Sequence, residues 1–412
     1  MRRCGLLGQP LKHSYSPAIH KALGGGYSYA LFEVKPEDLA GFLERGDWDG
    51  INVTMPYKQA VIPFCAELSP IAKAIGSVNT IVRRPDGSLY GDNTDATGFR
   101  TMLHQSGITV AGKKILVLGS GGSSLTVRHV LGEEGAGEIT IISRRGTETY
   151  ETLDRHRDVQ VIVNTTPVGM YPNTGETLIN LDWFPMLEGV MDLIYNPART
   201  RLLMEAKARG IPAMGGLSML VGQASAAAEQ FAGDDVRIAP CDTALSALRY
   251  QMENLILIGM PGVGKTRLGG LVAECMGRPS IDIDREIEKA TGCTIPEIFE
   301  QKGEEGFRRI ETQILAQWGK ESGLVIATGG GAVTREENYP HLHQNGKMIL
   351  LERDLDKLER NGRPLSQGDL QALYEYRFPL YQHFADCTLR NEGELEEVIN
   401  QILEVSHEIL SH

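Results

Sequence analysis

The sequence predicts an α/β protein, and three observations support that class. Two glycine loops, which begin at Gly119 and Gly259, each follow a short apolar run and precede a helical stretch. Strand-like and helical segments alternate along the chain, as in parallel sheets covered by helices. At 412 residues the chain is also too long for one compact core. We therefore expect an N-terminal α/β substrate domain, a Rossmann-like domain, and then a P-loop α/β domain with a parallel sheet.

Composition limits the partners of this chain. The formal net charge is −12, and residues 251–412 carry most of it, with 17 Lys+Arg against 27 Asp+Glu. An acidic surface of this kind disfavours nucleic acid and anionic membranes, since both require a basic face. Small-molecule substrates are therefore the expected partners, and the sequence does not set the oligomeric state.

Cysteine use and hydropathy indicate a cytoplasmic protein. The six cysteines are scattered without a C-x-x-C pair, so the sequence predicts neither a zinc site nor a disulfide framework. The N-terminal residues are too short and glycine-broken for a signal sequence, and no run of 18 apolar residues occurs.

The chain order predicts three domains. Residues 1–100 form the substrate domain, to which helices from about 217–250 return; residues 101–250 form the Rossmann-like domain, and 251–412 the P-loop domain. The strands expected before residue 250 are Tyr29–Val34, Gly50–Thr54, Thr80–Arg83, Glu138–Ser143, Val159–Asn164 and Gly189–Leu193. The helices expected there are Leu217–Phe231 and Asp242–Met252, and the second of these runs into the last domain without a linker.

The second glycine loop is the sharper signal. Residues 259–266 fit G-x-x-x-x-G-K-[ST], follow the strand-like Leu255–Ile258, and open a helix over Arg267–Met276. Lys265 should bridge the β- and γ-phosphates of ATP, and the Thr266 hydroxyl should ligate Mg²⁺. The nucleotide contacts expected in this loop are Gly262, Val263, Gly264, Lys265, Thr266 and Arg267.

Two carboxylates follow this loop, in Ser280-Ile281-Asp282-Ile283-Asp284. At the end of a strand both would lie on one face. In a phosphotransferase, Asp282 would assist Mg²⁺ directly or through water, and Asp284 would accept the proton of the acceptor hydroxyl. Alternatively, Asp284 is only the N-cap of the next helix.

The first glycine loop, Gly119-Ser120-Gly121-Gly122-Ser123-Ser124, is a dinucleotide-type loop with Ser124 where a third Gly or Ala usually stands. About 24 residues further on, Ser143-Arg144-Arg145 replaces the acidic residue that would bind a ribose hydroxyl. Arg144 suits a 2′-phosphate, which indicates NADP(H), although a solvated arginine pair is the alternative. The expected cofactor contacts are Gly119, Ser120, Gly121, Gly122, Ser123, Ser143, Arg144, Leu193 and Gly216.

Four polar residues in the first half are ambiguous by themselves. Ser14 and Ser16 could donate to one carboxylate, but Ser16 could also be an N-cap with Pro17 at the first helical position. Lys58 could be a solvated surface charge, and Asp95 an Asx-turn residue.

The segments around these four residues indicate their roles, because this half of the chain resembles shikimate dehydrogenase. The matching blocks are Gly8–Pro17, Asn52–Thr54 with Lys58, Gly76–Thr80, Gly91–Asp95, Asn164–Met170, Asp192–Pro197 and Gly216–Gln223. The resemblance implies that Lys58 and Asp95 are the catalytic pair, and that the substrate is held by Ser14, Ser16, Thr54, Asn79, Asp95, Tyr195 and Gln223. Only about 20 residues separate Arg144 from Asn164, so we expect a cofactor domain shortened by a helix and a strand relative to the family.

The last third of the chain is similar to shikimate kinase. The matching blocks are Gly303–Glu311, Thr328–Gly331, Arg363–Leu365 and Arg377–Tyr381. This likeness implies that Arg308 and Arg377 hold the shikimate carboxylate and that Gly330 lies against the substrate beside Asp284. Arg363, in a lid, would reach the ATP phosphates.

The two resemblances support each other, because the product of the first activity is the substrate of the second. They imply reduction of 3-dehydroshikimate with NADPH, followed by phosphorylation of shikimate with MgATP. One alternative is a non-catalytic sensor of aromatic precursors, which the retained Lys58, Asp95, Lys265 and Asp284 oppose. The other is an NAD-dependent quinate/shikimate dehydrogenase, which Arg144 and the attached kinase oppose.

Overall fold

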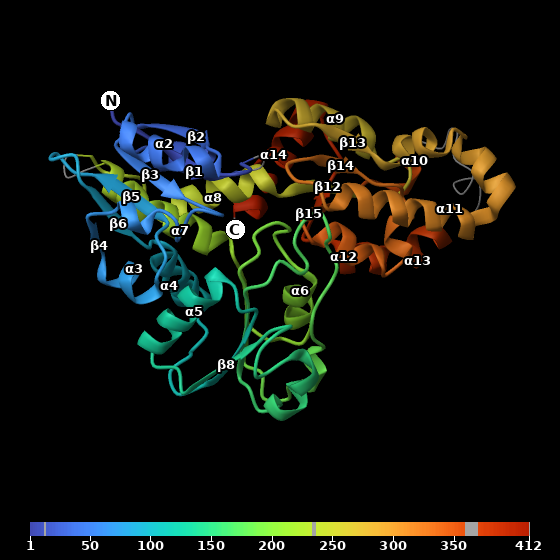
Figure 1. Cartoon of the computed structure of the whole chain (residues 1–412). Coiled ribbons are helices and arrows are strands. Elements are labelled where there is room, and N and C mark those ends of the chain that lie inside the picture. Colours follow the sequence, from blue (N-terminus) through green and yellow to red (C-terminus); the bar gives the residue numbers. More distant parts are fainter. Residues whose placement is uncertain (12–13, 233–235, 359–369, 412) are drawn as a thin grey trace. The chain divides into compact units, whose positions relative to one another are not determined.

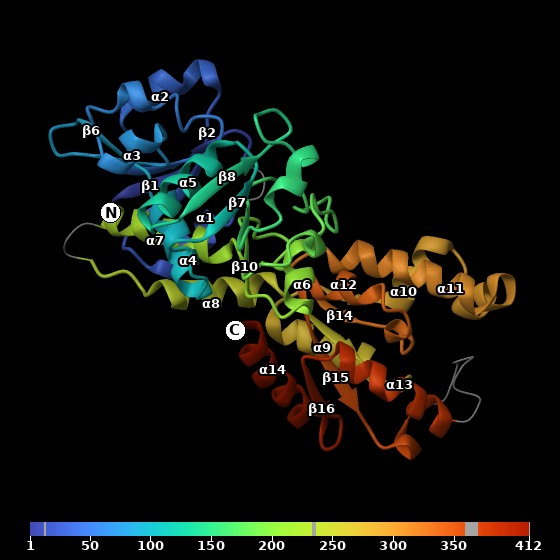
Figure 2. The same ribbon diagram turned by 90° about the horizontal axis from the view of Figure 1, so that it is seen from below.

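The computed structural model describes residues 1–11, 14–232, 236–358 and 370–411, and confirms the α/β class (Figures 1 and 2). The chain divides into two compact units. Unit 1 comprises Met1–Met170, Glu176–Tyr195 and Leu202–Leu248; unit 2 comprises Tyr171–Gly175, Asn196–Arg201 and Arg249–His412. The main boundary falls near residue 250, but the sequence did not predict the two short segments that unit 2 takes from the first half of the chain.

The first sheet of unit 1 is mixed and has the order β2-β1-β3-β5-β6-β4. Its strands are β1 Arg3–Gly8, β2 Ser28–Glu33, β3 Gly50–Val53, β4 Glu67–Leu68, β5 Thr80–Arg83 and β6 Leu89–Asp92. Strand β5 pairs antiparallel with β3 and β6, and the other pairs are parallel. The helical segments along it are α1 Ser16–Leu23, η1 Pro36–Asp38, α2 Leu39–Arg45, η2 Ile62–Phe64, α3 Pro70–Ile75 and α4 Asp95–Ser106.

The second sheet of unit 1 is parallel throughout, with the order β11-β10-β9-β7-β8. Its strands are β7 Lys114–Leu118, β8 Glu138–Ile142, β9 Val161–Asn164, β10 Gly189–Asp192 and β11 Ala213–Gly215. The helical segments are α5 Gly122–Glu133, η3 Tyr150–His156, η4 Leu181–Trp183 and α6 Arg201–Ala208. The chain passes from β7 outward to β8 and returns to β9 on the other side, so a ligand crevice is expected at the carboxyl end of β7.

Helix α7 (Leu217–Ala232) links the two sheets of unit 1, because it packs against α1, α4, β3 and β5 after leaving the second sheet (Figure 1). Its buried face is formed mainly by small residues, including Gly222, Ala224, Ala227 and Ala228, which permit close packing against α4. Helix α8 (Cys241–Met252) follows and continues into unit 2.

Unit 2 contains a third, fully parallel sheet with the order β13-β14-β12-β15-β16. Its strands are β12 Asn254–Ile258, β13 Ser280–Asp282, β14 Val325–Ala327, β15 Gly346–Glu352 and β16 Cys387–Arg390. The helical segments are α9 Lys265–Met276, α10 Ile283–Thr291, α11 Ile295–Gly319, η5 Ala332–Thr334, α12 Asn338–His343, η6 Leu355–Lys357, α13 Leu370–Phe384 and α14 Leu395–Ser411. The central strands are apolar and buried, as expected for a parallel sheet covered on both faces.

No helix in the described part of the chain is long and apolar enough to cross a membrane.

Candidate active sites

A small cavity of about 130 Å³ in unit 1 gathers the side chains predicted to bind substrate. Its walls include Ser14, Ser16, Thr54, Lys58, Asn79, Tyr195 and Gln223. These residues come from the start of α1, the loops after β3 and β10, the residue before β5, and α7. The fold therefore brings together groups that are more than 200 positions apart in the sequence.

The two serines at the cavity take different positions from those of a simple N-cap. Helix α1 begins at Ser16 with Tyr15 as the N-cap, and no side chain caps it in that position. Instead, the Ser14 hydroxyl accepts a hydrogen bond from the Ser16 backbone N–H at 3.2 Å. The N-cap interpretation of Ser16 is therefore wrong, and both serine side chains line the cavity.

Lys58 and Asp95 form an ion pair, with 2.5 Å between Lys58 Nζ and Asp95 Oδ2. Asp95 is the first residue of α4, and its side chain is 12% exposed; that of Lys58 is 30% exposed and reaches the cavity wall. The Lys58 carbonyl accepts from the Val78 backbone N–H, which fixes the loop after β3 beside the sheet. This geometry holds an ammonium group at the cavity with a carboxylate beside it, an arrangement that suits the predicted catalytic role of the pair.

The first glycine loop has the geometry of a pyrophosphate site. Gly119 has φ of 102°, and a Cβ atom there would lie 2.8 Å from the Thr165 hydroxyl, so only glycine fits at the end of β7. A Cβ on Gly121 or Gly122 would meet no atom within 4 Å, which leaves the start of α5 open to a ligand. Ser124 is buried, and its backbone N–H donates to the Gly121 carbonyl. The loop thus fits a dinucleotide phosphate at a helix N-terminus.

Leu193 and Gly216 meet at the same edge of the sheet. A Cβ on Gly216 would lie 2.0 Å from the Leu193 carbonyl oxygen, and the Gly216 N–H donates to the Ile194 carbonyl at 2.9 Å. Glycine at 216 therefore lets the loop after β11 approach the end of β10.

Arg144 is exposed directly after β8, and the preceding Ser143 is buried, with its hydroxyl donating to the Arg145 carbonyl at 2.6 Å. The turn therefore has a fixed backbone and an exposed guanidinium. The connection from β8 to β9 contains η3, a seven-residue 3-10 helix, where a full crossover helix would be usual.

We expect Arg144→Ala to weaken the binding of NADPH selectively and to raise its KM by about 10- to 100-fold, because the substitution removes hydrogen bonds to a charged 2′-phosphate. The KM for NADH should change little. Arg145→Ala is the matched control, since it removes another exposed arginine side chain from the neighbouring position. Steady-state kinetics with both cofactors measure the effect; equal kcat/KM for NADH and NADPH in the parent enzyme would contradict the assignment.

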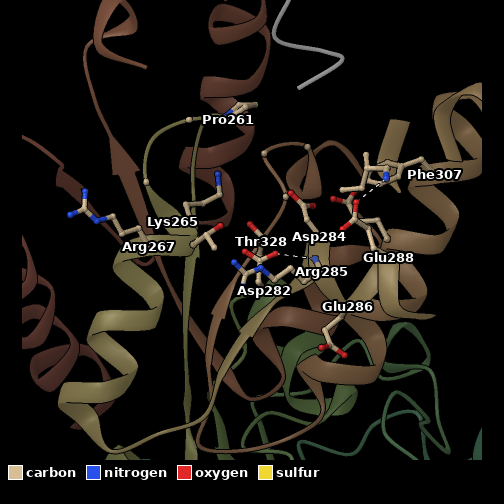
Figure 3. Close-up of a pocket in the computed structure, with 18 of the residues that line it drawn as sticks. Pro261, Lys265, Arg267, Asp282, Asp284, Arg285, Glu286, Glu288, Phe307 and Thr328 are labelled. Carbon is tan, nitrogen blue, oxygen red and sulfur yellow. Dashed lines mark hydrogen bonds between the residues drawn. The ribbon is translucent and has the colours of Figure 1, made fainter. Parts of the chain in front are cut away.

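Unit 2 contains a larger cavity of about 800 Å³ beside the P-loop (Figure 3). Gly264 has φ of 101° and is the N-cap of α9, so the loop ends at a helix N-terminus, where backbone N–H groups suit an anion. Lys265 is buried, and its Nζ donates to the carbonyls of Gly259 and Met260 at 2.7 and 3.0 Å. Thr266 and Arg267 follow on the first turn of α9, and both line the cavity with Gly262 and Gly264.

The D-x-D pair lies at the cavity, but its local structure differs from the expectation. Strand β13 ends at Asp282, and α10 begins at Ile283, so the two carboxylates do not share one strand face. Asp282 is the N-cap, because its Oδ1 accepts from the Arg285 N–H at 3.1 Å (Figure 3). Asp284 lies within the first turn of α10, so the interpretation of Asp284 as the N-cap is wrong. Both residues line the cavity.

Arg308 and Arg377 also line this cavity, from α11 and α13, and both are buried. Arg308 Nη1 donates to Glu311 at 2.6 Å, and Arg377 Nη1 donates to the Gly330 carbonyl at 3.2 Å. The Nε atoms of both arginines are buried without a hydrogen-bond partner among the described residues. Two buried cations at one cavity suit an anionic ligand.

Arg363, the lid residue expected to reach the ATP phosphates, lies outside the described residues. Among the described residues, no three His, Cys, Asp or Glu side chains gather as a metal site. Thr266 and Asp282 at the cavity provide one hydroxyl and one carboxylate, a set that fits a Mg²⁺ ion held largely by phosphates and water.

Sequence reasoning assigned no role to several residues that support these sites. Glu311 is fully buried against Arg308; burial raises the pKa of its carboxyl, and nearby Asp284 adds to that effect. Tyr381 donates its phenol hydrogen to the Gly330 carbonyl. The spacing of Arg308 and Glu311, three residues apart on one helix, was the signal for the first contact.

In unit 1, the residue to which the sequence assigned no role is His20. A lone histidine on an apolar helix face gives no functional signal. Burial lowers the pKa of His20 from 6.5 to about 3, against a smaller raising effect of its hydrogen bond to Asn52. Below pH 6.5 the unfolded chain therefore binds a proton that the folded chain excludes. Neutral His20 costs the folded state no stability above pH 6.5, and the free energy of unfolding falls as the pH drops from there toward 3.

We expect His20→Gln to remove this dependence. Between pH 7 and pH 5 the parent should lose about 2 kcal/mol more of its free energy of unfolding than the variant, because one shifted group accounts for that amount. Urea unfolding at the two pH values measures the difference. Equal losses in the two proteins would show that His20 is not the responsible group.

A chain with a dinucleotide loop beside a small polar cavity in one unit, and a P-loop beside an arginine-lined cavity in the other, is an oxidoreductase joined to a phosphotransferase. Comparison with known proteins identifies both parts. A model of the shikimate dehydrogenase substrate binding domain matches residues 6–81, and a model of shikimate kinase matches residues 261–407. The chain belongs to the shikimate dehydrogenase family and carries a shikimate kinase domain at its C-terminal end.

Two curated relatives illustrate the family. The shikimate dehydrogenase (NADP(+)) of Moorella thermoacetica is 37% identical over 269 residues, which cover 58% of this chain and 91% of the relative. That of Methanopyrus kandleri is 39% identical over 266 residues, covering 57% and 91%. The expectation of NADP(H) for the first half, and of ATP with Mg²⁺ for the second, is confirmed at the level of these families.

Solved structures support the same family for the first part of the chain. A chorismate mutase/shikimate 5-dehydrogenase fusion protein from Clostridium acetobutylicum has a TM-score of 0.57 at 34% identity, covering 60% of this chain and 97% of that one. Shikimate 5-dehydrogenase from Thermus thermophilus, in complex with NADP(H) and shikimate, has a TM-score of 0.55 at 33% identity, with coverage of 60% and 99%. A quinate dehydrogenase from Corynebacterium glutamicum, in complex with NAD, matches at 25% identity with a TM-score of 0.55, covering 60% and 98%.

Proposed function

We propose that this chain catalyses two consecutive steps: reduction of 3-dehydroshikimate to shikimate with NADPH, and transfer of a phosphoryl group from MgATP to the 3-hydroxyl of shikimate. The observation that carries the first activity is the Lys58–Asp95 ion pair at a cavity lined by the other predicted substrate-binding groups. The second rests on the P-loop, Asp284 and two buried arginines around one cavity.

In the first half, the ring carboxylate of the substrate would accept from the hydroxyls of Ser14 and Ser16, while Asn79 and Gln223 bind ring oxygens. Lys58 would donate to the oxygen at the reacting carbon and stabilise the negative charge that grows there during hydride transfer. Bound NADPH would supply the hydride. Asp95 keeps the ammonium oriented through the 2.5 Å contact. Either member of the pair can deliver the proton.

In the second half, Arg308 and Arg377 would hold the shikimate carboxylate, which directs the ring toward Asp284. Asp284 accepts the proton of the 3-hydroxyl, and this makes the oxygen a better nucleophile. Lys265 and the backbone N–H groups of the loop would bind the phosphates, and Mg²⁺, when bound, would offset part of their negative charge. Thr266 and Asp282 are the proposed magnesium ligands, and Arg363 the proposed lid contact.

The proposal also places the enzyme in the cytoplasm, in keeping with its six free cysteines. It assigns residues 1–100, with the helices from about 217–250, to substrate binding, residues 101–250 to the cofactor, and 251–412 to the kinase.

Each half can be tested alone in the purified full chain. We expect shikimate to reduce NADP⁺ in the absence of ATP, and shikimate to release ADP from MgATP in the absence of NADP⁺. Quinate should be oxidised far more slowly than shikimate. Preference for quinate with NAD⁺ would favour a catabolic dehydrogenase, and binding of shikimate without either turnover would favour a sensor.

A further inference from the structure

A chain of hydrogen-bonded side chains runs along the wall of the small cavity of unit 1. It runs from Tyr27 through His20, Asn52, Thr80 and Asn79 to Gln223, and is called the donor chain below. His20, Thr80 and Asn79 are buried, and His20, Asn52, Asn79 and Gln223 also line the cavity. The donor chain therefore connects the cavity wall with a tyrosine in the loop after α1.

The orientation of Asn79 is fixed by a backbone group. Its Oδ1 faces the Thr94 N–H at 2.7 Å, and a backbone N–H can only donate, so this atom must be the amide oxygen. Asn79 Nδ2 then donates to Gln223 Oε1 at 3.2 Å. Because Gln223 uses its oxygen on Asn79, its NH₂ group is the end that remains for the cavity.

The remaining donors and acceptors of the donor chain follow from the orientation of Asn79. Thr80 Oγ1 donates to Asn79 Oδ1 at 3.1 Å, so it accepts from Asn52 Nδ2 at 3.2 Å. Asn52 Oδ1 therefore faces His20 Nε2 at 3.1 Å. A neutral His20 carries its single hydrogen on Nε2, and its Nδ1 accepts from the Tyr27 hydroxyl at 2.6 Å. All donors point the same way, from Tyr27 toward Gln223.

The surroundings of His20 favour this single arrangement. Its ring stacks on Tyr29 with 3.8 Å between centroids, and Phe231 packs nearby at 5.9 Å. The Tyr29 hydroxyl donates to Asn52 Oδ1 at 2.8 Å, which gives that oxygen a second donor and opposes rotation of the amide. The ring is thus held in place by packing, and both of its nitrogens are used in the donor chain.

We propose that His20 is a positioning residue of the dehydrogenase site: through Asn52 and Thr80 it adds to the hold of the Thr94 N–H on Asn79, so that Asn79 and its partner Gln223 both present amide N–H donors to the substrate. Such a wall binds oxygens that accept, which are the hydroxyl and carbonyl oxygens of a polyhydroxylated ring. This inference rests on the proposed dehydrogenase function. It assigns His20 no proton transfer and no role in cofactor binding.

The test is a double-mutant cycle in the full chain. His20→Phe keeps a ring that can stack on Tyr29 but removes both nitrogens, and we expect the KM for shikimate to rise roughly tenfold, the effect of one buried hydrogen bond. The kcat and the KM for NADP⁺ should stay within about twofold by the same reasoning. His20→Gln, which restores one amide donor, should recover most of the loss.

In a Gln223→Ala background, the rise caused by His20→Phe should shrink to less than about twofold, because the end of the donor chain is already absent. A tenfold rise in both backgrounds, or no rise in the parent background, would overturn the proposal. If His20→Phe does not fold, the same cycle with Tyr27→Phe decides, because coupling to Gln223 supports the proposal and an unchanged KM overturns it.

Two further measurements separate this inference from the proposed function. Parent turnover of shikimate with NADP⁺ tests the function itself. If the parent binds shikimate but does not oxidise it, calorimetric dissociation constants replace KM in the cycle, and the positioning role is still tested by the same coupling.

Discussion

Asp284→Asn is expected to lower the phosphoryl-transfer rate by about 10²- to 10⁴-fold, the contribution of a positioned general base, while MgATP still binds. The amide is nearly isosteric with the carboxylate but does not accept the proton of the shikimate hydroxyl. Dehydrogenase turnover should be unchanged, because Asp284 belongs to the cavity of unit 2. Shikimate-dependent ADP release and calorimetric titration with MgATP measure the two effects.

Glu286→Gln is the matched control for Asp284. This carboxylate also lies on α10 and lines the cavity, but Figure 3 shows its side chain directed away from Asp284. We expect near-parental turnover in the control. Loss of MgATP binding in Asp284→Asn would indicate a metal or structural role for Asp284 instead of a base.

Lys58→Ala should lower the kcat of the dehydrogenase by roughly 10²-fold or more and raise KM much less, because the ammonium acts mainly on charge that develops in the transition state. The variant also leaves Asp95 without the cation that it contacts at 2.5 Å. Kinase turnover should persist. Steady-state rates in both directions of the dehydrogenase reaction check the result.

The exposed lysine at position 73, on α3, provides the control Lys73→Ala, which should leave both activities unchanged. Near-parental reduction of 3-dehydroshikimate by Lys58→Ala would show that the ion pair is structural.

The elements that the sequence predicted well are those with strong local patterns. Apolar runs before the two glycine loops correspond to β7 and β12, and the helix expected over Arg267–Met276 is α9, which begins at Lys265. The helix expected over Leu217–Phe231 is α7, with one added residue. In each case a buried strand or an amphipathic stretch is bounded by glycine or by a capping signal, so local chemistry alone determines the element.

The predictions from sequence were wrong where contacts between distant residues, or a helix cap, determine the structure. Asp282 was expected to share a strand face with Asp284, but its carboxylate caps α10, and the strand ends at Asp282 instead of reaching Asp284. Residues 196–201 belong to unit 2, because Arg199 pairs with Glu253 at 2.8 Å and donates to the His343 carbonyl. No local pattern predicts contacts between residues so far apart in the sequence.

The residues of the candidate sites also divide into those predicted from local motifs and those that depend on contacts between distant residues. The P-loop side chains follow from one motif, whereas the contact of Asn79 with Gln223 joins residues 144 positions apart and was expected only through resemblance to a family. His20, on α1, received no role, because its partners Tyr27 and Asn52 come from the following loop and from strand β3. Its function is visible only when the hydrogen bonds are followed in three dimensions.

The central claim is that one chain performs two consecutive reactions, and a single time course tests it. Purified enzyme is mixed with 3-dehydroshikimate, NADPH and MgATP, and NADPH oxidation is followed together with shikimate 3-phosphate. We predict that both proceed to equal final amounts, that Lys58→Ala blocks both, and that Asp284→Asn blocks only the phosphate ester, so that shikimate accumulates. NADPH oxidation without any shikimate 3-phosphate in the parent enzyme, or neither product, would contradict the account.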